Sequence, residues 1–145
     1  PAQALPVNRS KNISEVSRMK KLFGVLLDVQ NSKVQKIEIE DSLDEFYRIL
    51  NCSLVDMPVR KIGNKYFTII CDDEGLFAED YKISATNNFG QPQLVGNLFI
   101  VSAENIDGEL QSLTDDDANY ILKHVLTIFT RKHPEGYPAL TQVEY

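Results

Sequence analysis

Leu94-Val95-Gly96-Asn97-Leu98-Phe99-Ile100-Val101 is the most apolar stretch of the chain, and it predicts a buried β-strand that continues to Ser102. Before it, Cys71-Asp72-Asp73-Glu74-Gly75 predicts the end of another strand in an acidic turn closed by glycine. After it, Ser112-Leu113-Thr114-Asp115-Asp116-Asp117 predicts the start of a helix, because Thr114 is a good N-cap and a helix N-terminus favours carboxylates. These segments indicate a fold more clearly than they indicate a chemistry.

The composition sets the class of protein. A chain of 145 residues with 43% hydrophobic and 25% charged residues has the size and apolar content of one folded domain. Its formal charge of -6 argues against electrostatic capture of nucleic acid, so no nucleic-acid partner is expected. Its lysines and arginines are interleaved with its acids, which argues against a DNA mimic. No apolar run approaches the roughly 18 residues of a membrane span, and two cysteines make no disulfide framework, so we expect a cytoplasmic protein without a membrane partner.

The chain divides into a tail and one domain. Residues 1–18 lack apolar periodicity and predict a flexible N-terminal tail or a remnant of cloned sequence, and residues 19–145 predict a single α+β domain. A first hairpin is expected from Leu22 to Glu40 across Gln30-Asn31-Ser32. A second is expected from Val55 to Cys71 across Gly63-Asn64, with Pro58 on an edge strand or with its nitrogen facing outward.

Two helices complete the prediction. Ser42-Leu43-Asp44-Glu45 is a capping box and predicts a short helix to about Leu50. Thr114 predicts the cap of a long C-terminal helix that runs to about Arg131. The core face of the long helix is expected to contain Ala118, Ile121, Leu122, Val125, Leu126 and Phe129. The predicted fold is an antiparallel sheet of about five strands built from hairpins, covered on one face by both helices.

The carboxylate clusters have structural explanations. Asp72-Asp73-Glu74 follows a strand, where metal or acid-base sites are often built, but the spacing matches no calcium loop and a solvated turn closed by Gly75 explains it. Asp115-Asp116-Asp117 suits the first turn of a helix without any ligand. Gly96-Asn97 interrupts an apolar strand, which predicts a bulge or a close approach by a ligand, and the bulge is the preferred interpretation.

The cysteines also have a structural explanation. Cys71 is expected to be buried and inert, because neither His124 nor His133 occupies the position of a poised base. In the second hairpin Cys71 is expected to lie opposite Asp56, too far from Cys52 for a disulfide, so we predict two free thiols. The glycines form neither a Walker-type nor a dinucleotide-binding phosphate loop.

The order of three motifs resembles a known family. Asp73-Glu74-Gly75-Leu76, then residues 91–101, then Ser112-Leu113-Thr114-Asp115 are similar to the bacterial and phage family catalogued as domain of unknown function 3846. The likeness covers roughly residues 22–125 and leaves the first 18 residues outside. The resemblance implies a small cytoplasmic protein of bacteria, phages or mobile elements, and it brings no catalytic residues with it.

These observations favour a non-enzymatic binding or accessory protein of a bacterium, phage or mobile element, acting on a host protein or a small metabolite. The expected binding residues are Asp72, Asp73, Glu74, Gly75, Gly96 and Asn97; no catalytic residue, metal ligand or cofactor is expected. One alternative is a metal-dependent hydrolase that uses the Asp72–Glu74 cluster. Another is a structural homo-oligomer built through an exposed strand, such as the strand that carries Pro58.

Overall fold

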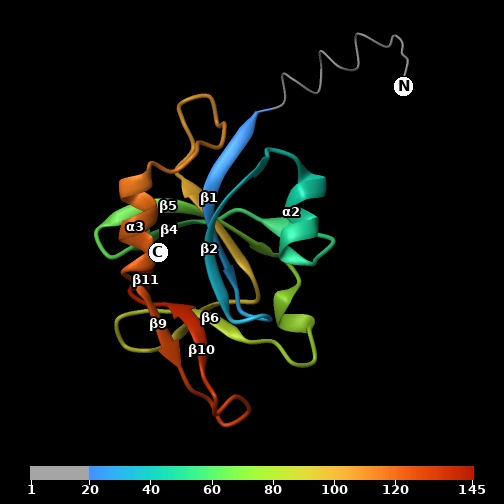
Figure 1. The fold of residues 1–145 in the computed structure, drawn as a ribbon, viewed down its shortest axis with the longest axis vertical. Coiled ribbons are helices and arrows are strands. Elements are labelled where there is room, and N and C mark those ends of the chain that lie inside the picture. The colour runs from blue at the N-terminus through green and yellow to red at the C-terminus, as the bar shows by residue number, and fades with distance from the viewer. Residues whose placement is uncertain (1–19) are drawn as a thin grey trace.

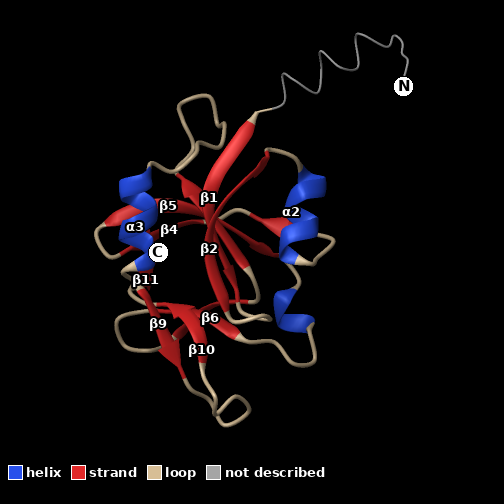
Figure 2. Cartoon of the chain, viewed as in Figure 1, coloured by secondary structure: helices blue, strands red, loops and turns tan. Residues whose placement is uncertain are grey.

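The computed structural model describes residues 20–145, which form two sheets, two helices and one 3₁₀ turn (Figures 1 and 2). The larger sheet contains β1 (Lys21–Asp28), β2 (Lys33–Glu40), β3 (Val55–Asp56), β4 (Val59–Ile62), β5 (Lys65–Asp72), β8 (Leu98–Ser102) and β11 (Val143–Glu144). The smaller sheet contains β6 (Ile83–Thr86), β7 (Pro92–Val95), β9 (Val125–Ile128) and β10 (Tyr137–Leu140). The helices are α2 (Leu43–Leu50) and α3 (Asp115–Leu122), and the 3₁₀ turn is η1 (Gly75–Phe77). The predicted tail, residues 1–18, lies outside the described residues.

The larger sheet is antiparallel throughout and has seven strands instead of the expected five or so. Its order is β11-β4-β5-β8-β1-β2, with β3 also paired to β5. The smaller sheet has the order β7-β6-β10-β9 and contains one parallel pair, β6 with β10. The smaller sheet was not predicted, because β9 was expected to be part of a helix and because the pair of β6 with β10 joins segments more than 50 residues apart.

Both faces of the larger sheet are covered, which corrects the expectation that the helices share one face. Along the central strand β8, Leu98 and Ile100 belong to one buried cluster and Phe99 and Val101 to another, because successive side chains of a strand point to opposite faces. α3 packs in the first cluster together with the smaller sheet, and α2 packs in the second. Figure 1 shows the two helices on opposite sides of the sheet.

The predicted long C-terminal helix is wrong beyond Leu122. There the backbone N–H groups of Lys123 and His124 bond to carbonyls of the last turn of α3, and the chain continues as strand β9. β9 pairs antiparallel with β10. This segment is rich in β-branched residues, which favour strands, and a helix at this position would lose the pairing. Leu126 and Phe129, expected in the core, are 57% and 67% exposed.

The predicted strand from Leu94 to Ser102 is two strands in different sheets. β7 ends at Val95 in the smaller sheet, and β8 begins at Leu98 in the larger one. Gly96 has a φ of +77°, a left-handed conformation that glycine adopts without strain. The pair Gly96-Asn97 therefore marks the crossing between sheets and not a bulge within one strand.

The two hairpins and the Thr114 helix cap, which neighbouring residues determine, are confirmed. β1 pairs with β2 as a hairpin, and β4 pairs with β5 across Gly63-Asn64, where Gly63 has a φ of +61°. The Thr114 hydroxyl accepts a hydrogen bond from the Asp117 amide at 3.1 Å.

The structure corrects two predicted details, one in the capping box at Ser42 and one in the strand expected to carry Pro58. In the capping box the Ser42 hydroxyl accepts from the Glu45 amide at 3.3 Å, but the Glu45 carboxylate pairs with Arg48 instead of reaching back. Pro58 lies between β3 and β4, and β4 is not an edge strand because β11 covers it.

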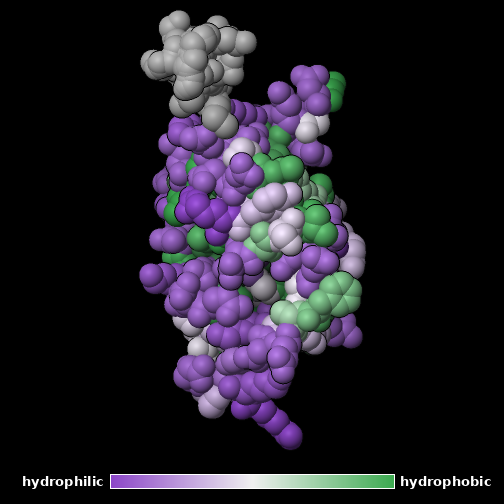
Figure 3. Space-filling view, turned by 90° about the vertical axis from the view of Figure 1, so that its right-hand side faces the viewer, coloured by the Kyte–Doolittle hydropathy of each residue, from purple (hydrophilic) through white to green (hydrophobic). Residues whose placement is uncertain are grey.

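The outer surface over α2 is mainly hydrophilic. Figure 3 shows apolar patches on this face that are separated by polar side chains. Within residues 20–145 neither helix has the length and apolar character needed to cross a membrane.

Candidate functional site

The structure brings most of the predicted binding residues together. Asp72, Gly75, Gly96 and Asn97 line one hollow of about 170 Å³, and Asp72, Asp73 and Gly75 line a second of the same size beside it. Glu74 lines neither. The acidic turn and Gly96-Asn97 therefore share one hollow, while their role in binding stays a prediction.

Each of these residues also has a structural task. The Asp72 carboxylate accepts the Glu74 amide at 2.9 Å and so closes the turn. A side chain at Gly75 would meet the Val95 side chain at 2.9 Å. Asn97 is 7% exposed, and its Oδ1 accepts the backbone N–H of Val29 at 3.0 Å, which holds the end of β1 against the crossing between the sheets.

The carboxylate clusters do not converge. Within residues 20–145 no group of three His, Cys, Asp or Glu side chains is placed to hold a metal ion. In α3, Asp115 pairs with Lys36 at 2.8 Å and Asp117 pairs with Lys65 at 2.9 Å, so these acids fasten the helix to β2 and β5.

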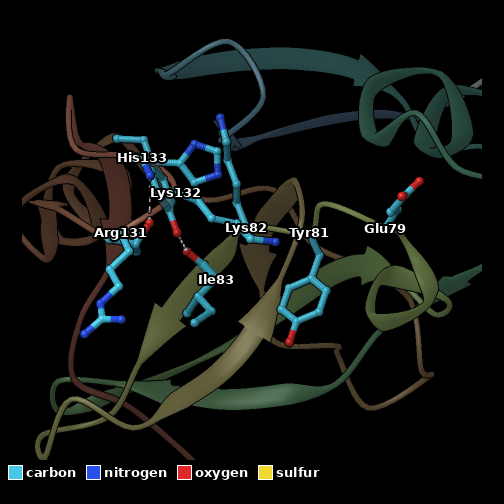
Figure 4. A pocket seen from close by; sticks show the side chains of 9 residues that line it. Glu79, Tyr81, Lys82, Ile83, Arg131, Lys132 and His133 are labelled. Carbon is cyan, nitrogen blue, oxygen red and sulfur yellow. Dashed lines mark hydrogen bonds between the residues drawn. The ribbon is translucent and has the colours of Figure 1, made fainter.

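A larger hollow of about 330 Å³ lies elsewhere, at the end of the smaller sheet, and we call it the basic pocket (Figure 4). One wall comes from the loop that leads into β6, and the other comes from the turn between β9 and β10 and from the start of β10. Its lining residues are Glu79, Tyr81, Lys82, Ile83, Thr130, Arg131, Lys132, His133 and Tyr137. In Figure 4 Lys82 lies between His133 and Lys132 on one side and Tyr81 and Glu79 on the other.

Charge distinguishes the basic pocket from the rest of the molecule. The chain has 15 Lys and Arg against 21 Asp and Glu, whereas the pocket lining has three Lys or Arg against one Glu. Asp80 lies outside the lining at 3.9 Å from Lys132, and both of these side chains are largely exposed. An exposed pair at this separation is weak, so it leaves much of the positive potential of Lys132 available to a ligand.

The floor of the basic pocket is fixed by Tyr137. This residue is buried, and its hydroxyl donates to the Ile83 carbonyl at 2.7 Å. Burial raises the pKa of Tyr137, so the hydroxyl stays neutral and keeps donating. Lys82 is held above the Tyr137 ring, with its Nζ 5.4 Å from the ring centroid and 3.2 Å from the Val29 carbonyl.

His133 presents an unused polar atom in this wall. Its ring packs edge-on against Tyr137 at 5.7 Å between centroids. Its Nε2 is buried and makes no hydrogen bond within residues 20–145; the Asp80 carboxylate lies 3.9 Å from Nε2, and the Glu135 carboxylate lies 3.6 Å from Nδ1 of the same ring. Since buried polar atoms usually have a partner, Nε2 is free to bond to a ligand atom in the pocket.

Sequence reasoning missed the basic pocket for one reason. The predicted long helix has Arg131 and Lys132 at its C-terminal end, where basic side chains are favoured by the helix dipole without any ligand. His133 then follows as the exit from that helix. The signal that indicates the site is the consecutive Arg131-Lys132-His133 in an acidic chain, just before Pro134 and Gly136. Only the strand pairing of β9 with β10 turns this run toward the loop that carries Lys82.

The cysteines are free, as predicted, and Cys71 lies opposite Asp56 in the β3–β5 pair. Burial raises the pKa of Cys71 to about 12, and burial followed by the nearby Asp72 raises the pKa of Cys52. At pH 8 a thiol with a pKa of about 12 is ionised to roughly one part in 10,000.

We therefore expect native Cys71 to resist alkylation by iodoacetamide at pH 8, with mass spectrometry of peptides locating the label. The protein unfolded without reductant should titrate as two thiols. Rapid alkylation of native Cys71 would contradict its assignment as an inert core residue.

Comparison with known proteins supports the resemblance seen in the motifs. The model of the domain of unknown function 3846 matches residues 19–126, more than half of the chain. The match ends within β9, so it includes the Lys82 wall of the basic pocket and excludes the wall from Thr130 to Tyr137. No curated protein and no solved structure matches the chain. The chain thus belongs to the family of the domain of unknown function 3846.

Proposed function

We propose that this protein is a non-enzymatic binding module for a small anionic ligand, which it holds in the basic pocket. The observation that carries the proposal is the gathering of Lys82, Arg131, Lys132 and His133 around one hollow in a chain of net charge -6. In a mainly acidic molecule such a hollow focuses positive potential where a ligand enters. The volume of about 330 Å³ suits a small molecule and not a macromolecular segment.

The side chains in the basic pocket suit phosphoryl or carboxylate groups. Lysine and arginine donate charge-assisted hydrogen bonds to such oxygens, and Nε2 of His133 makes no hydrogen bond to the described residues. Tyr81 is 44% exposed at the edge of the pocket, so its ring is free to stack on a planar part of the ligand. Tyr81 also lines the hollow that contains Asp72, Gly75, Gly96 and Asn97, which is where a longer ligand would extend.

The protein would act in the cytoplasm of a bacterium, as a product of the host, a phage or a mobile element, and bind a metabolite of that cell. A small molecule is favoured over a host protein because the basic pocket is a hollow of about 330 Å³, and concave sites of this size usually bind small molecules.

Calorimetric titration with a panel of small ligands tests this function. Inorganic pyrophosphate, adenosine 5′-monophosphate and citrate are expected to bind at low salt, and the neutral nucleoside adenosine is expected to bind much more weakly. The ranking of the two phosphate compounds against citrate shows which anion the pocket prefers. Lys82→Gln should weaken anion binding by about tenfold, because it removes one charge-assisted hydrogen bond.

Lys123→Gln is the matched control, since Lys123 is outside the pocket lining and is exposed. It should leave the affinity unchanged. Equal losses in both variants would show that only overall charge is sensed, and the absence of binding by all three anions would overturn the proposed function. Because Lys82 also bonds to the Val29 carbonyl, the unfolding midpoint of each variant is measured alongside.

A further inference from the structure

We infer that β2 is a dimerisation edge, at which a second copy of this chain pairs antiparallel and extends the seven-stranded sheet across a twofold axis. β2 is the last strand of the larger sheet and pairs only with β1 among the described strands. It is eight residues long, whereas a short edge strand is one of the usual protections against such pairing. The inference does not depend on the basic pocket, to which β2 contributes no residue.

The free hydrogen-bonding groups of β2 can be assigned from its pairing with β1. The Asp41 amide donates to the Lys20 carbonyl at 2.9 Å, so the odd-numbered residues of β2 bond inward to β1. In an antiparallel ladder the intervening residues then point their N–H and C=O groups to the other side. The residues with outward groups are Val34, Lys36, Glu38 and Glu40.

This assignment restricts the register of a symmetric pair. Each copy must use its even-numbered residues, so the twofold axis has to pass through a residue of β2 and not between two residues. An axis at Lys36 would set two lysines directly opposite each other, and an axis at Glu38 would set two glutamates opposite each other. Like charges at opposed positions are unfavourable.

An axis at Ile37 gives a complementary edge instead. Lys36 of each copy then faces Glu38 of the other, and Lys33 faces Asp41, so that opposite charges meet at four places along the pair. Ile37 meets its own copy at the centre, on the face that packs against α2 and is only partly buried in the single chain. The charges of β2, which in other proteins discourage edge pairing, here favour the axis at Ile37 over the axes at Lys36 and Glu38.

The side chains are placed for these contacts. Lys36 already points toward α3, where it pairs with Asp115 at 2.8 Å and remains 32% exposed. Glu38 is exposed and makes no ion pair with any residue from 20 to 145. Figure 1 shows α3 and α2 on opposite sides of the sheet, and β1 is the only described strand that pairs with β2.

Sedimentation velocity over a concentration series of the full chain tests this inference. The wild type is expected to show a monomer–dimer equilibrium, and K36E and E38K should each raise its dissociation constant at least about tenfold by placing like charges opposite each other. An equimolar mixture of K36E and E38K should recover dimer, because the two carboxylates of the first variant then face the two ammonium groups of the second. The double variant K36E/E38K should recover it as well.

E104K is the matched control, since Glu104 is exposed in the loop that follows β8 and is not part of β2, and it should dimerise like the wild type. A wild type that stays monomeric at all concentrations would overturn the inference. So would a dimer that both charge variants leave intact, because that dimer would use another surface.

Discussion

Phe99→Ala is expected to lower the free energy of unfolding by about 3–5 kcal/mol, the usual loss when a buried phenylalanine is truncated. Phe99 is fully buried in the central strand β8, between Leu26 and Ile70 of its neighbours. Its ring also packs against Phe46 of α2, with 6.4 Å between the centroids. The truncation therefore leaves a cavity where β1, β5, β8 and α2 meet. Urea denaturation followed by circular dichroism measures the loss.

Phe129→Ala is the matched control for this prediction. Phe129 follows β9 and is 67% exposed, so its truncation should change the free energy of unfolding by less than about 1 kcal/mol. A long helix from Thr114 to Arg131 would instead bury Phe129 and make the two losses similar. Similar losses would thus contradict the strand pairing of β9 with β10. If Phe99→Ala does not fold, Phe99→Leu should show a smaller loss in the same direction.

Gly24→Ala is expected to destabilise the fold by about 3 kcal/mol, at the upper end of the usual range for overpacking a core. Gly24 lies in β1, and a side chain there would come within 2.5 Å of the Ile100 carbonyl and 2.8 Å of the Phe99 ring. The carbonyl belongs to the backbone of β8 and cannot move without disturbing the sheet. The same denaturation measurement applies.

Gly90→Ala separates this steric effect from backbone strain. Gly90 has a φ of +76° but nothing lies within 4 Å of an added side chain, so only strain of about 1 kcal/mol is expected. A double-mutant cycle tests the steric cause further: in the Phe99→Ala background the loss from Gly24→Ala should shrink by at least about 1 kcal/mol. Additive losses would show that the ring does not restrict Gly24.

The features predictable from sequence are those that neighbouring residues decide. The two hairpins, the Thr114 cap and the left-handed Gly63 follow from turn and cap chemistry within a few residues. The end of α3 does not, because Val125–Ile128 is apolar enough for a buried helix face and becomes a strand only through pairing with Tyr137–Leu140. The smaller sheet depends likewise on a parallel pair between Ala85 and Leu140.

The same distinction applies to the candidate sites. Asp72, Gly75, Gly96 and Asn97 could be singled out from turn and strand chemistry, but the hollow that they share is visible only in the structure. The basic pocket joins residues about 50 positions apart, through strands that were not predicted. Its chemistry is visible in the sequence as Arg131-Lys132-His133, but its second wall is visible only in the fold.

The most direct test of the central claim, an anion site in the basic pocket, is a ¹H–¹⁵N NMR titration of the full chain with inorganic pyrophosphate. The predicted result is a saturable shift of the backbone amide signals of Lys82, Arg131, Lys132 and His133, with much smaller shifts for the amides of α2 on the opposite side of the larger sheet. Absence of saturable shifts, or saturable shifts centred outside the basic pocket, would contradict the account.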